Sequence, residues 1–342
     1  KLLVIDDLAN RNHKADWLLD ANRLKPLEDQ SYNQYLPSDC ELLLGPAYAL
    51  LAPEYSLLQP QLPLRRKLER LLVFFGGVDQ ANLSAVTLEA LRHPRLQSLE
   101  VDLVLGSGAP HHAEIEKLID DRPGVELHVG LPSLAGLMTR ADLAVGAAGT
   151  ASLERACLGL PSLVVPVAEN QRQGALALDM SGAARCLNLL HAADQVAELQ
   201  SALLEIQARP DLLQEMSECC LQLGDGRGLC RVVAYLMGPA CGLRLRSVQP
   251  ADLWLYLWWA NDPEVRRQSF VSKNISLDNH RQWFQRRLHS PLALMRVMMD
   301  GEGLPLGQIR FERESETDSK AIVGFSLDRL ARGRGLASQL LA

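Results

Sequence analysis

Several clusters of small and polar residues follow apolar runs of the sequence. The first is Phe74-Phe75-Gly76-Gly77-Val78-Asp79, in which paired glycines come directly after a strand-like run. Glycine has no Cβ, so the backbone at Gly76 and Gly77 can approach a diphosphate and point its N–H groups at the oxygens. A plain tight turn between a strand and a helix would give the same pattern, so this cluster by itself leaves both interpretations open.

A second cluster joins the small-residue loop Gly146-Ala147-Ala148-Gly149 to a helical stretch that begins with Thr150 and Ser152. Such a helix N-terminus attracts anions, although an ordinary helix cap has the same composition. Glu154 lies four residues after Thr150 and so misses the three-residue spacing of a capping box. Its carboxylate could instead accept hydrogen bonds from both hydroxyls of a ribose.

A third cluster, Ala168-Glu169-Asn170-Gln171, follows the apolar run Leu163 to Val167. Most loops of this kind are simply solvated. In a parallel sheet, however, ligands bind where the strands end, and all three clusters fall at the carboxyl ends of expected strands. Their coincidence predicts one binding site at this edge of the sheet.

The fourth motif is Arg332-Gly333-Arg334-Gly335-Leu336-Ala337, which follows the strand-like run Ala321 to Leu327. Successive backbone N–H groups in such a glycine-rich turn can wrap a pyrophosphate, because the glycines permit close approach. The alternative is a basic surface turn. The preceding strand and the start of a helix after the motif favour the pyrophosphate site.

The elements that must position these residues alternate regularly between strands and helices. The strands are expected at Leu71–Phe75, Val101–Leu105, Val125–Val129, Leu143–Val145 and Leu163–Val167, with helical stretches between them. This order predicts a parallel sheet with right-handed crossovers. Earlier strands are expected at Leu2–Asp7 and Leu42–Leu44, and an α+β order of elements begins near Leu243.

We therefore expect three domains. Residues 1–60 are interpreted as the last part of an incomplete, doubly wound domain, and residues 61–238 as a complete ligand-binding one. A different domain follows at residues 243–342, because Gly238-Pro239 marks a boundary and four of the five tryptophans lie between Trp254 and Trp283. Both ends of the sequence fall inside apparent elements, so we expect the chain to be a fragment.

Composition limits the partners of the chain. The formal net charge is −6 with acids and bases evenly scattered, which argues against a nucleic-acid surface. The seven cysteines lack paired spacing, no apolar run reaches membrane-spanning length, and no signal peptide opens the sequence. These features predict a cytoplasmic protein without a membrane partner. No residue spacing calls for a metal.

The stretch from Gly76 to Gln171 resembles the UDP-2,4-diacetamido-2,4,6-trideoxy-β-L-altropyranose hydrolases of pseudaminic acid biosynthesis. The similarity lies in the runs Phe75 to Asn82, Gly149 to Pro161 and Ala168 to Gln171, and it extends to Val4–Ala9 and Leu44–Leu51. It covers roughly residues 1 to 238. The resemblance implies the GT-B architecture of two Rossmann-like domains, the second of which holds UDP.

The same resemblance implies which residues contact the UDP-sugar. Glu154 would bind the ribose, and Asn170 would face the sugar phosphate as a catalytic residue. The full set of implied UDP- and substrate-binding residues is Gly76, Gly77, Asp79, Asn82, Gly149, Thr150, Ser152, Glu154, Glu169, Asn170 and Gln171. The family's catalytic histidine lies in a Gly-Thr-Gly-His motif that this sequence lacks, so we expect it upstream of residue 1. His13 is assigned no role.

Residues 243–342 resemble the GNAT-family N-acetyltransferases. The resemblance implies that acetyl-CoA binds at Arg332, Gly333, Arg334, Gly335 and Ala337. The later strands and helices of that family do not follow within the sequence, so the domain is expected to be partial and the fragment to be inactive. The segment Trp258-Trp259-Ala260-Asn261-Asp262 resembles acetyltransferases that modify amino sugars, although tryptophans at this spacing more often belong to a core helix.

Together these patterns predict a bifunctional sugar-nucleotide enzyme. The hydrolase would release UDP and the free diacetamido sugar, and the acetyltransferase would perform the preceding N-acetylation. A GT-B glycosyltransferase would use the same UDP site with a sugar acceptor in place of water. A non-catalytic nucleotide-sugar-binding module is the other alternative.

Overall fold

The computed structural model describes residues 1–23, 31–59, 62–120, 122–239, 241–269, 271–317 and 320–341. The chain divides into two units, Lys1–Gly228 and Leu229–Ala342. The division falls ahead of Gly238, because helix α9 (Gly228–Met237) buries Ala234 in the same core cluster as residues of the second unit. Each unit is described below by itself.

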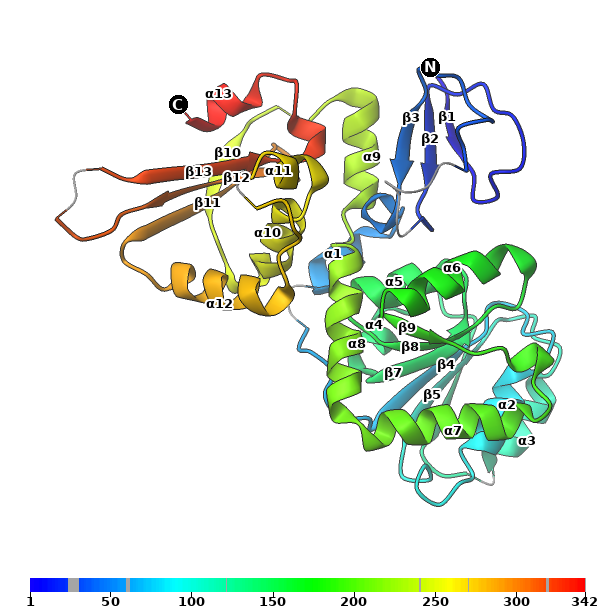
Figure 1. Cartoon of the computed structure of the whole chain (residues 1–342). Coiled ribbons are helices and arrows are strands. Elements are labelled where there is room, and N and C mark those ends of the chain that lie inside the picture. The colour runs from blue at the N-terminus through cyan, green and yellow to red at the C-terminus, as the bar shows by residue number, and fades with distance from the viewer. Residues whose placement is uncertain are drawn as a thin grey trace. The chain divides into compact units, whose positions relative to one another are not determined.

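The first unit begins with a small parallel sheet (Figure 1). Its order is β1-β2-β3, formed by Leu3–Ile5, Trp17–Asp20 and Glu41–Leu44. The strand β2 was not expected from the sequence. It has only four residues, between a polar segment and a turn. A short 3-10 helix, Pro46–Tyr48, and helix α1, Pro53–Leu58, lead out of this sheet.

The second sheet of the first unit has six strands, all parallel, in the order β6-β5-β4-β7-β8-β9. The chain therefore winds outward in one direction from β4, returns, and winds outward in the other. The strands are β4 (Arg70–Phe74), β5 (Glu100–Leu105), β6 (Val125–Val129), β7 (Leu143–Ala147), β8 (Ser162–Val165) and β9 (Ala184–Cys186). The predicted parallel α/β sheet is confirmed, with β9 as an additional edge strand.

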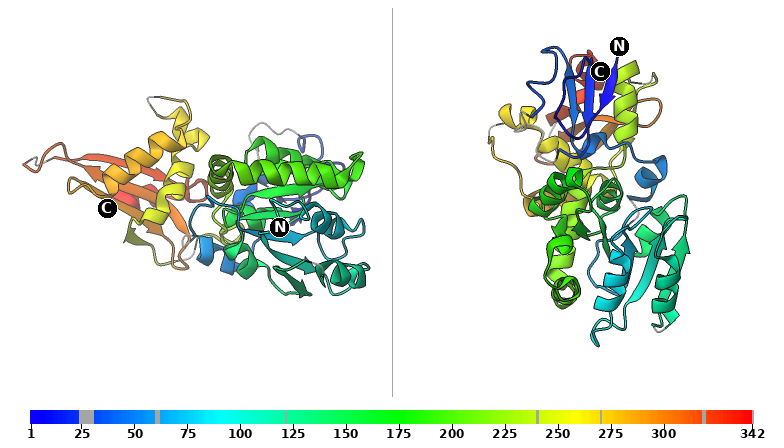
Figure 2. Two further views of the ribbon diagram at one scale, coloured as in Figure 1. Left: turned by 90° about the horizontal axis from the view of Figure 1, so that it is seen from below. Right: turned by 90° about the vertical axis from the view of Figure 1, so that its right-hand side faces the viewer.

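Helices cover both faces of this sheet (Figures 1 and 2). One core cluster joins the strands to α2 (Leu83–Ala90), α3 (His112–Asp120) and α7 (Gln195–Ala208). Two further clusters join the opposite side chains of the strands to α4 (Ala135–Arg140), α5 (Ala151–Cys157), α6 (Glu169–Met180) and α8 (Pro210–Leu223). Because the strands are buried on both faces, they appear in the sequence as continuous apolar runs.

A glycine-rich segment after α8 packs tightly against the segment that follows the small sheet. A Cβ on Gly228 would lie 2.2 Å from the carbonyl oxygen of Ala49, and one on Gly226 would lie 2.9 Å from the backbone nitrogen of Ser56. Gly226 also has a positive φ of 73°. Only glycine permits such an approach of two backbones, so the residues near 224–228 and 46–56 form one closely packed seam.

The second unit contains an antiparallel sheet in the order β10-β11-β12-β13. This sheet confirms the predicted change of fold after the parallel repeat. In the described part of the second unit, three α-helices separate its first two strands. The elements are β10 (Arg244–Ser247), α10 (Leu253–Ala260), α11 (Pro263–Arg267), α12 (Leu277–Leu288), β11 (Ala293–Met299), β12 (Pro305–Glu312), β13 (Ile322–Leu327) and α13 (Leu336–Leu341).

Aromatic residues form much of the core between α10, α12 and the sheet. Tyr256 and Trp259 are buried beside Phe284, and the Tyr256 and Phe284 rings meet edge to face at 5.5 Å. The interpretation of the tryptophan segment as a core helix therefore holds for Trp259. Trp258 is instead partly exposed, and the guanidinium of Arg231 lies over its ring at 4.5 Å.

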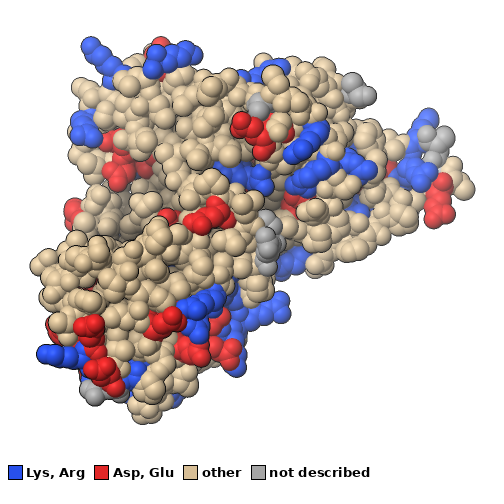
Figure 3. All heavy atoms as spheres, turned by 180° about the vertical axis from the view of Figure 1, so that it is seen from behind, with Lys and Arg blue, Asp and Glu red and all other residues tan. Residues whose placement is uncertain are grey.

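The surface carries charges of both signs on each unit, as the face drawn in Figure 3 shows. Every cysteine is a free thiol. Within the described residues, each helix is too short or too polar to cross a lipid bilayer.

Candidate functional site

The loops that carry the predicted site residues emerge at one edge of the six-stranded sheet. Phe74 at the end of β4 is paired with Gly146 on β7, and Ala147 on β7 is paired with Val165 at the end of β8. The strand order reverses between β4 and β7. In parallel α/β sheets the crevice beside such a reversal, at the carboxyl ends of the strands, is where ligands bind.

The loop after β4 has the open backbone that the sequence predicts. Gly76 has a φ of 92°, and a Cβ on either Gly76 or Gly77 would meet no atom within 4 Å. The neighbouring loop after β5 lies so close that a Cβ on Gly106 would fall 1.9 Å from the carbonyl oxygen of Gly77. The glycines at 76 and 77 thus leave free space on one side while two backbones touch on the other.

Two predicted binding residues of this loop have structural partners instead. The carboxylate of Asp79 accepts hydrogen bonds from the backbone nitrogens of Leu83 (3.0 Å) and Ser84 (2.9 Å), so it caps helix α2. The side chain of Asn82 donates from Nδ2 to Glu114 of α3 at 2.9 Å. Both side chains therefore fix the helices behind the loop, and the glycines are the part of the loop that faces open space.

The loop after β7 meets the start of α6. Gly149 is partly exposed and Thr150 is exposed. A Cβ on Gly149 would lie 3.6 Å from Nε2 of Gln171, whose Oε1 in turn accepts a hydrogen bond from the backbone nitrogen of Val167 at 3.0 Å. The second and third sequence clusters are thus brought into contact, as the sequence predicts.

Ser152 lies in the interior rather than at the surface of this loop. It is 5% exposed, and its hydroxyl accepts a hydrogen bond from the guanidinium of Arg155 at 2.9 Å. Arg155 also donates to the carbonyl oxygen of Ala147 at 2.9 Å. The expected contact between the Ser152 hydroxyl and a ligand is therefore not available in this arrangement. Nothing in the sequence around Arg155 distinguishes it from an ordinary helix residue.

Glu154 is half-buried on α5 and hydrogen-bonds the phenol of Tyr55 from α1. Burial raises the pKa of Glu154 above its usual value, although the Tyr55 hydrogen bond and the charge of Arg155 act in the opposite direction. Tyr55 is the partner that sequence reasoning missed. Glu154 is thus a partly desolvated acceptor, and its hydrogen bond to Tyr55 is one that a ligand hydroxyl could replace.

The first turn of α6 carries the remaining predicted residues. Glu169 and Asn170 are exposed, and Glu169 forms an ion pair with Arg172 at 3.4 Å. One turn further along, Gln173 accepts a hydrogen bond at 3.3 Å from Arg23, which follows β2. Glu169 and Asn170 both belong to α6, because that helix starts at Glu169. Their place at the carboxyl edge of the sheet is as expected.

The small sheet carries a polar cluster that the sequence analysis did not assign. Tyr32 donates to Asp20 at 2.9 Å and lies 3.2 Å from the buried carboxylate of Asp6. His13, to which no role was given, lies 3.6 Å from Asp6. Asp6 directly follows β1 and Asp20 ends β2, so these carboxylates also lie at strand carboxyl ends. Two carboxylates after an apolar run were the only sequence signal for this cluster.

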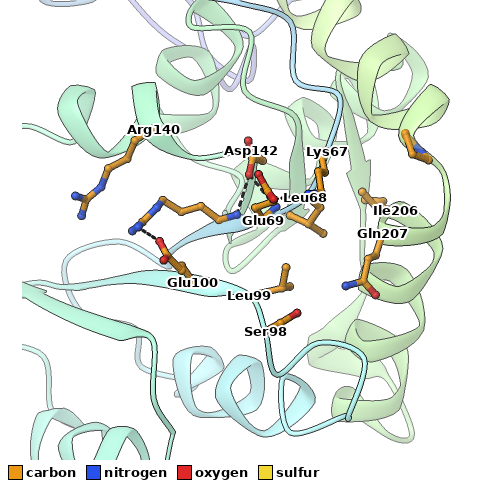
Figure 4. Close-up of a pocket in the computed structure, with 12 residues that line it drawn as sticks. Lys67, Leu68, Glu69, Ser98, Leu99, Glu100, Arg140, Asp142, Ile206 and Gln207 are labelled. Carbon is orange, nitrogen blue, oxygen red and sulfur yellow. Dashed lines mark hydrogen bonds and ion pairs between the residues drawn. The ribbon is translucent and has the colours of Figure 1, made fainter.

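A hollow of about 680 Å³ lies at the opposite edge of the large sheet, where the strands begin (Figure 4). Its charged residues pair with one another. Asp142 accepts hydrogen bonds from the backbone nitrogens of Glu69 and Arg70, while the Arg70 side chain pairs with Glu100. Because these groups already satisfy one another and lie far along the strands from the glycine loops, this hollow is not part of the predicted site.

Beside that hollow, Asp102, Glu126 and His128 have potential metal ligands within 4.8 Å of one another. The carboxylate of Asp102 is already engaged by two arginines, with Arg70 at 3.2 Å and Arg140 Nε at 3.0 Å. A metal ion would have to displace those guanidinium groups. The cluster is therefore best described as an ion-pair network around the buried carboxylate of Asp102.

The glycine-rich turn of the second unit follows β13 and a 3-10 helix, Arg329–Ala331. Gly333 and Gly335 have φ values of 70° and 74°, and a Cβ on either would meet no atom within 4 Å. Arg334 is exposed and Ala337 is partly buried at the start of α13. The turn therefore has the open, left-handed glycines that a pyrophosphate-binding backbone needs.

Arg332 differs from its neighbours, because its side chain is held inside the second unit. It pairs with Asp262 at 2.9 Å and with Glu264, and its Nε donates to the carbonyl oxygen of Leu327 at 3.0 Å. Any contact that Arg332 makes with a coenzyme in this arrangement would come from its backbone. Its side chain instead joins α11 to the base of the turn.

Two stretches of the chain match known domain families. Residues 71–225 match the glycosyltransferase family 28 C-terminal domain, and residues 242–342 match the acetyltransferase (GNAT) domain. The first match runs from β4 past the end of α8, so it contains all three loops at the carboxyl edge. The chain thus contains a stretch similar to the glycosyltransferase family 28 C-terminal domain, followed by a stretch similar to the acetyltransferase (GNAT) domain.

Particular relatives are similar over part of their length. The spore coat polysaccharide biosynthesis protein SpsG of Bacillus subtilis is 28% identical over 204 residues, which are 59% of this chain and 60% of SpsG. An uncharacterized protein of Methanocaldococcus jannaschii is 21% identical over 256 residues, 71% of this chain and 49% of that protein. The chain therefore spans about half to three fifths of the length of these curated relatives.

Two solved structures illustrate the similarity to known chains. MurG of Acinetobacter baumannii is 17% identical and matches 69% of this chain and 66% of its own, with a TM-score of 0.48. Spermidine N-acetyltransferase from Vibrio cholerae, in complex with CoA and spermine, is also 17% identical. It matches 29% of this chain and 59% of its own, with a TM-score of 0.27.

Proposed function

We propose that the first unit binds a UDP-sugar at the carboxyl edge of its six-stranded sheet. The observation that carries this proposal is the meeting of three features beside the reversal of strand order: the open Gly76-Gly77 loop, the exposed Gly149-Thr150 loop and the first turn of α6. Open glycine backbone suits a diphosphate, and the half-buried carboxylate of Glu154 suits the two hydroxyls of a ribose.

The chemistry of such a site is displacement at the anomeric carbon, with UDP as the leaving group. Backbone N–H groups of the two glycine loops would stabilise the charge that develops on the diphosphate. Asn170 is exposed on the first turn of α6, from where its amide can reach a sugar bound beyond the diphosphate. A base that activates the incoming oxygen would complete the site.

The narrower proposal is that water is the acceptor and that the sugar is the 2,4-diacetamido sugar of pseudaminic acid biosynthesis. It rests on the resemblance in the runs Phe75 to Asn82, Gly149 to Pro161 and Ala168 to Gln171. A glycosyltransferase would use the same UDP site with a sugar hydroxyl as acceptor. The similarity to SpsG, a spore coat polysaccharide biosynthesis protein by name, supports a role in polysaccharide biosynthesis in either case.

For the second unit we propose N-acetylation of an amino-sugar nucleotide by acetyl-CoA. The match to the acetyltransferase (GNAT) domain and the open glycines at positions 333 and 335 support a coenzyme site. An acetyltransferase and an enzyme that releases the acetylated sugar would act on successive forms of one substrate, and their fusion would place both activities on one chain.

Calorimetric titration with UDP, ADP, CDP and GDP tests the binding proposal, and UDP should bind most tightly. Release of UDP from the UDP-sugar by the full-length protein, in water enriched in oxygen-18, then separates the two reactions. Label in the free sugar without any added acceptor supports hydrolysis, whereas release only in the presence of a sugar acceptor supports transfer. Asn170→Ala should lower turnover more than it lowers UDP affinity. Equal affinity for all four nucleotides would overturn the binding proposal.

A further inference from the structure

A buried guanidinium lies directly beneath the loop after β7. Arg155 is 1% exposed, and its Nη2 donates to the carbonyl oxygen of Ala147 and to the hydroxyl of Ser152, both at 2.9 Å. A Cβ on Gly146 would lie 2.8 Å from Nη1 of the same side chain. The charged end of Arg155 therefore touches the backbone of the strand end and loop, from the interior side.

This charge lacks a direct counter-ion. In the described part of the chain the partners of the guanidinium are a carbonyl and a hydroxyl, and Nε has none. The nearby carboxylate of Glu154 is hydrogen-bonded to Tyr55 instead. Burial lowers the pKa of Arg155 to about 10, with Glu154 and the Cys220 thiol acting in the opposite direction, so the group is still charged at neutral pH.

A buried charge without a counter-ion is costly, and apolar side chains of similar volume often replace buried ions without loss of stability. Packing alone therefore gives no reason for an arginine at this position. A fixed positive charge behind a loop is, however, stabilised by an anion on the other side of that loop, because electrostatic interactions across a dry interior are weakly screened. The outer side of this loop is where the proposed diphosphate would lie.

We propose that Arg155 is a positioning residue for the diphosphate, a role that rests on the proposed UDP site. Its hydrogen bond to Ala147 holds the shape of the loop, and its charge attracts the diphosphate from beneath. A nucleoside diphosphate or its sugar ester would gain binding affinity from this charge, whereas an uncharged nucleoside at the same site would not.

The test compares UDP, UMP and uridine in calorimetric titrations of the full chain and three variants. Arg155→Gln removes the charge but keeps an amide that can donate to Ala147, Arg155→Met removes both, and Arg155→Lys keeps the charge. The two neutral variants should bind UDP on the order of tenfold more weakly, UMP less so, and uridine as the wild type does. Arg155→Lys should retain most of the affinity for UDP. Thermal melts identify any variant that does not fold, and the remaining neutral variant then carries the comparison.

Two outcomes would overturn the role of Arg155 while leaving the UDP site in place. In one, the neutral variants bind UDP as tightly as the wild type. In the other, they lose affinity for UDP and for uridine by the same factor, which would mean that the arginine only supports the fold of the loop. Failure of the wild-type chain to bind UDP would instead overturn the proposed function itself.

Discussion

Replacing Glu154 with alanine is the sharpest test of how the first unit would recognise a nucleotide. The carboxylate is half-buried and has one hydrogen-bond donor, Tyr55, in the free structure. Two ribose hydroxyls would give it two donors, so binding would add about one hydrogen bond to a charged, partly desolvated group. Such a bond contributes about 1.5–3 kcal/mol. Glu154→Ala should therefore raise the Kd for UDP roughly 10- to 150-fold.

The control for Glu154→Ala is a modified ligand rather than a second variant. The analogue of UDP that lacks both ribose hydroxyls keeps the diphosphate and the base, so it should bind the wild type and Glu154→Ala with the same affinity. Calorimetry of both proteins with both ligands gives a thermodynamic cycle in which the ribose contribution is isolated. If Glu154→Ala binds UDP as the wild type does, or weakens UDP and its dideoxy analogue equally, Glu154 does not recognise the ribose.

Three further predictions concern other parts of the chain. Tyr55→Phe removes the hydrogen bond that favours the charged form of Glu154, so its pKa should rise further and the decline of UDP affinity at low pH should begin at a higher pH than in the wild type; an unshifted pH profile would contradict the contact. Asp102→Asn should destabilise the first unit by about 2–4 kcal/mol in urea denaturation, because it breaks the ion pairs of a buried carboxylate. The control variant Glu126→Gln, at an exposed site, should change the free energy of unfolding by less than about 0.5 kcal/mol. Burial alone would raise the pKa of Asp102, but hydrogen bonds from Arg140, His128 and Arg70 lower it, so this stabilisation is present above the usual aspartate pKa and its loss should appear as the pH falls below about 4. Gly335→Val in the full-length protein should abolish acetyl-CoA binding by calorimetry, because a β-branched residue resists the φ of 74° and fills the space beside the turn; a folded variant that binds normally would identify the turn as a basic surface loop.

The sheet and the place of the site could be predicted because buried parallel strands leave continuous apolar runs, and ligand loops follow them. The strands β4 to β8 and the edge at which Gly76, Gly149 and Asn170 gather are such cases. The direction of individual side chains could not be predicted in the same way. Ser152 and Asp79 were both expected to contact the UDP-sugar, yet the Ser152 hydroxyl lies inside against Arg155 and the Asp79 carboxylate caps α2.

Contacts between distant segments were the other part that sequence could not supply. Tyr55 meets Glu154 across almost one hundred positions, and nothing in the local pattern around either residue indicates the pairing. The strands β2 and β9 were also missed.

The glycine seam between residues 224–228 and 46–56 determines the bounds of the smallest segment of the first unit that can be exchanged between proteins. The matched segment 71–225 ends inside this seam, and the backbone that it packs against lies ahead of β4. Recombination that carried only the matched segment would omit Gly226, whose backbone lies close to both Cys157 of α5 and Ser56. Swapped or separately expressed versions of this module should therefore run from about Gly45 through Gly228, and gene fusions that respect those limits should fold where shorter ones do not.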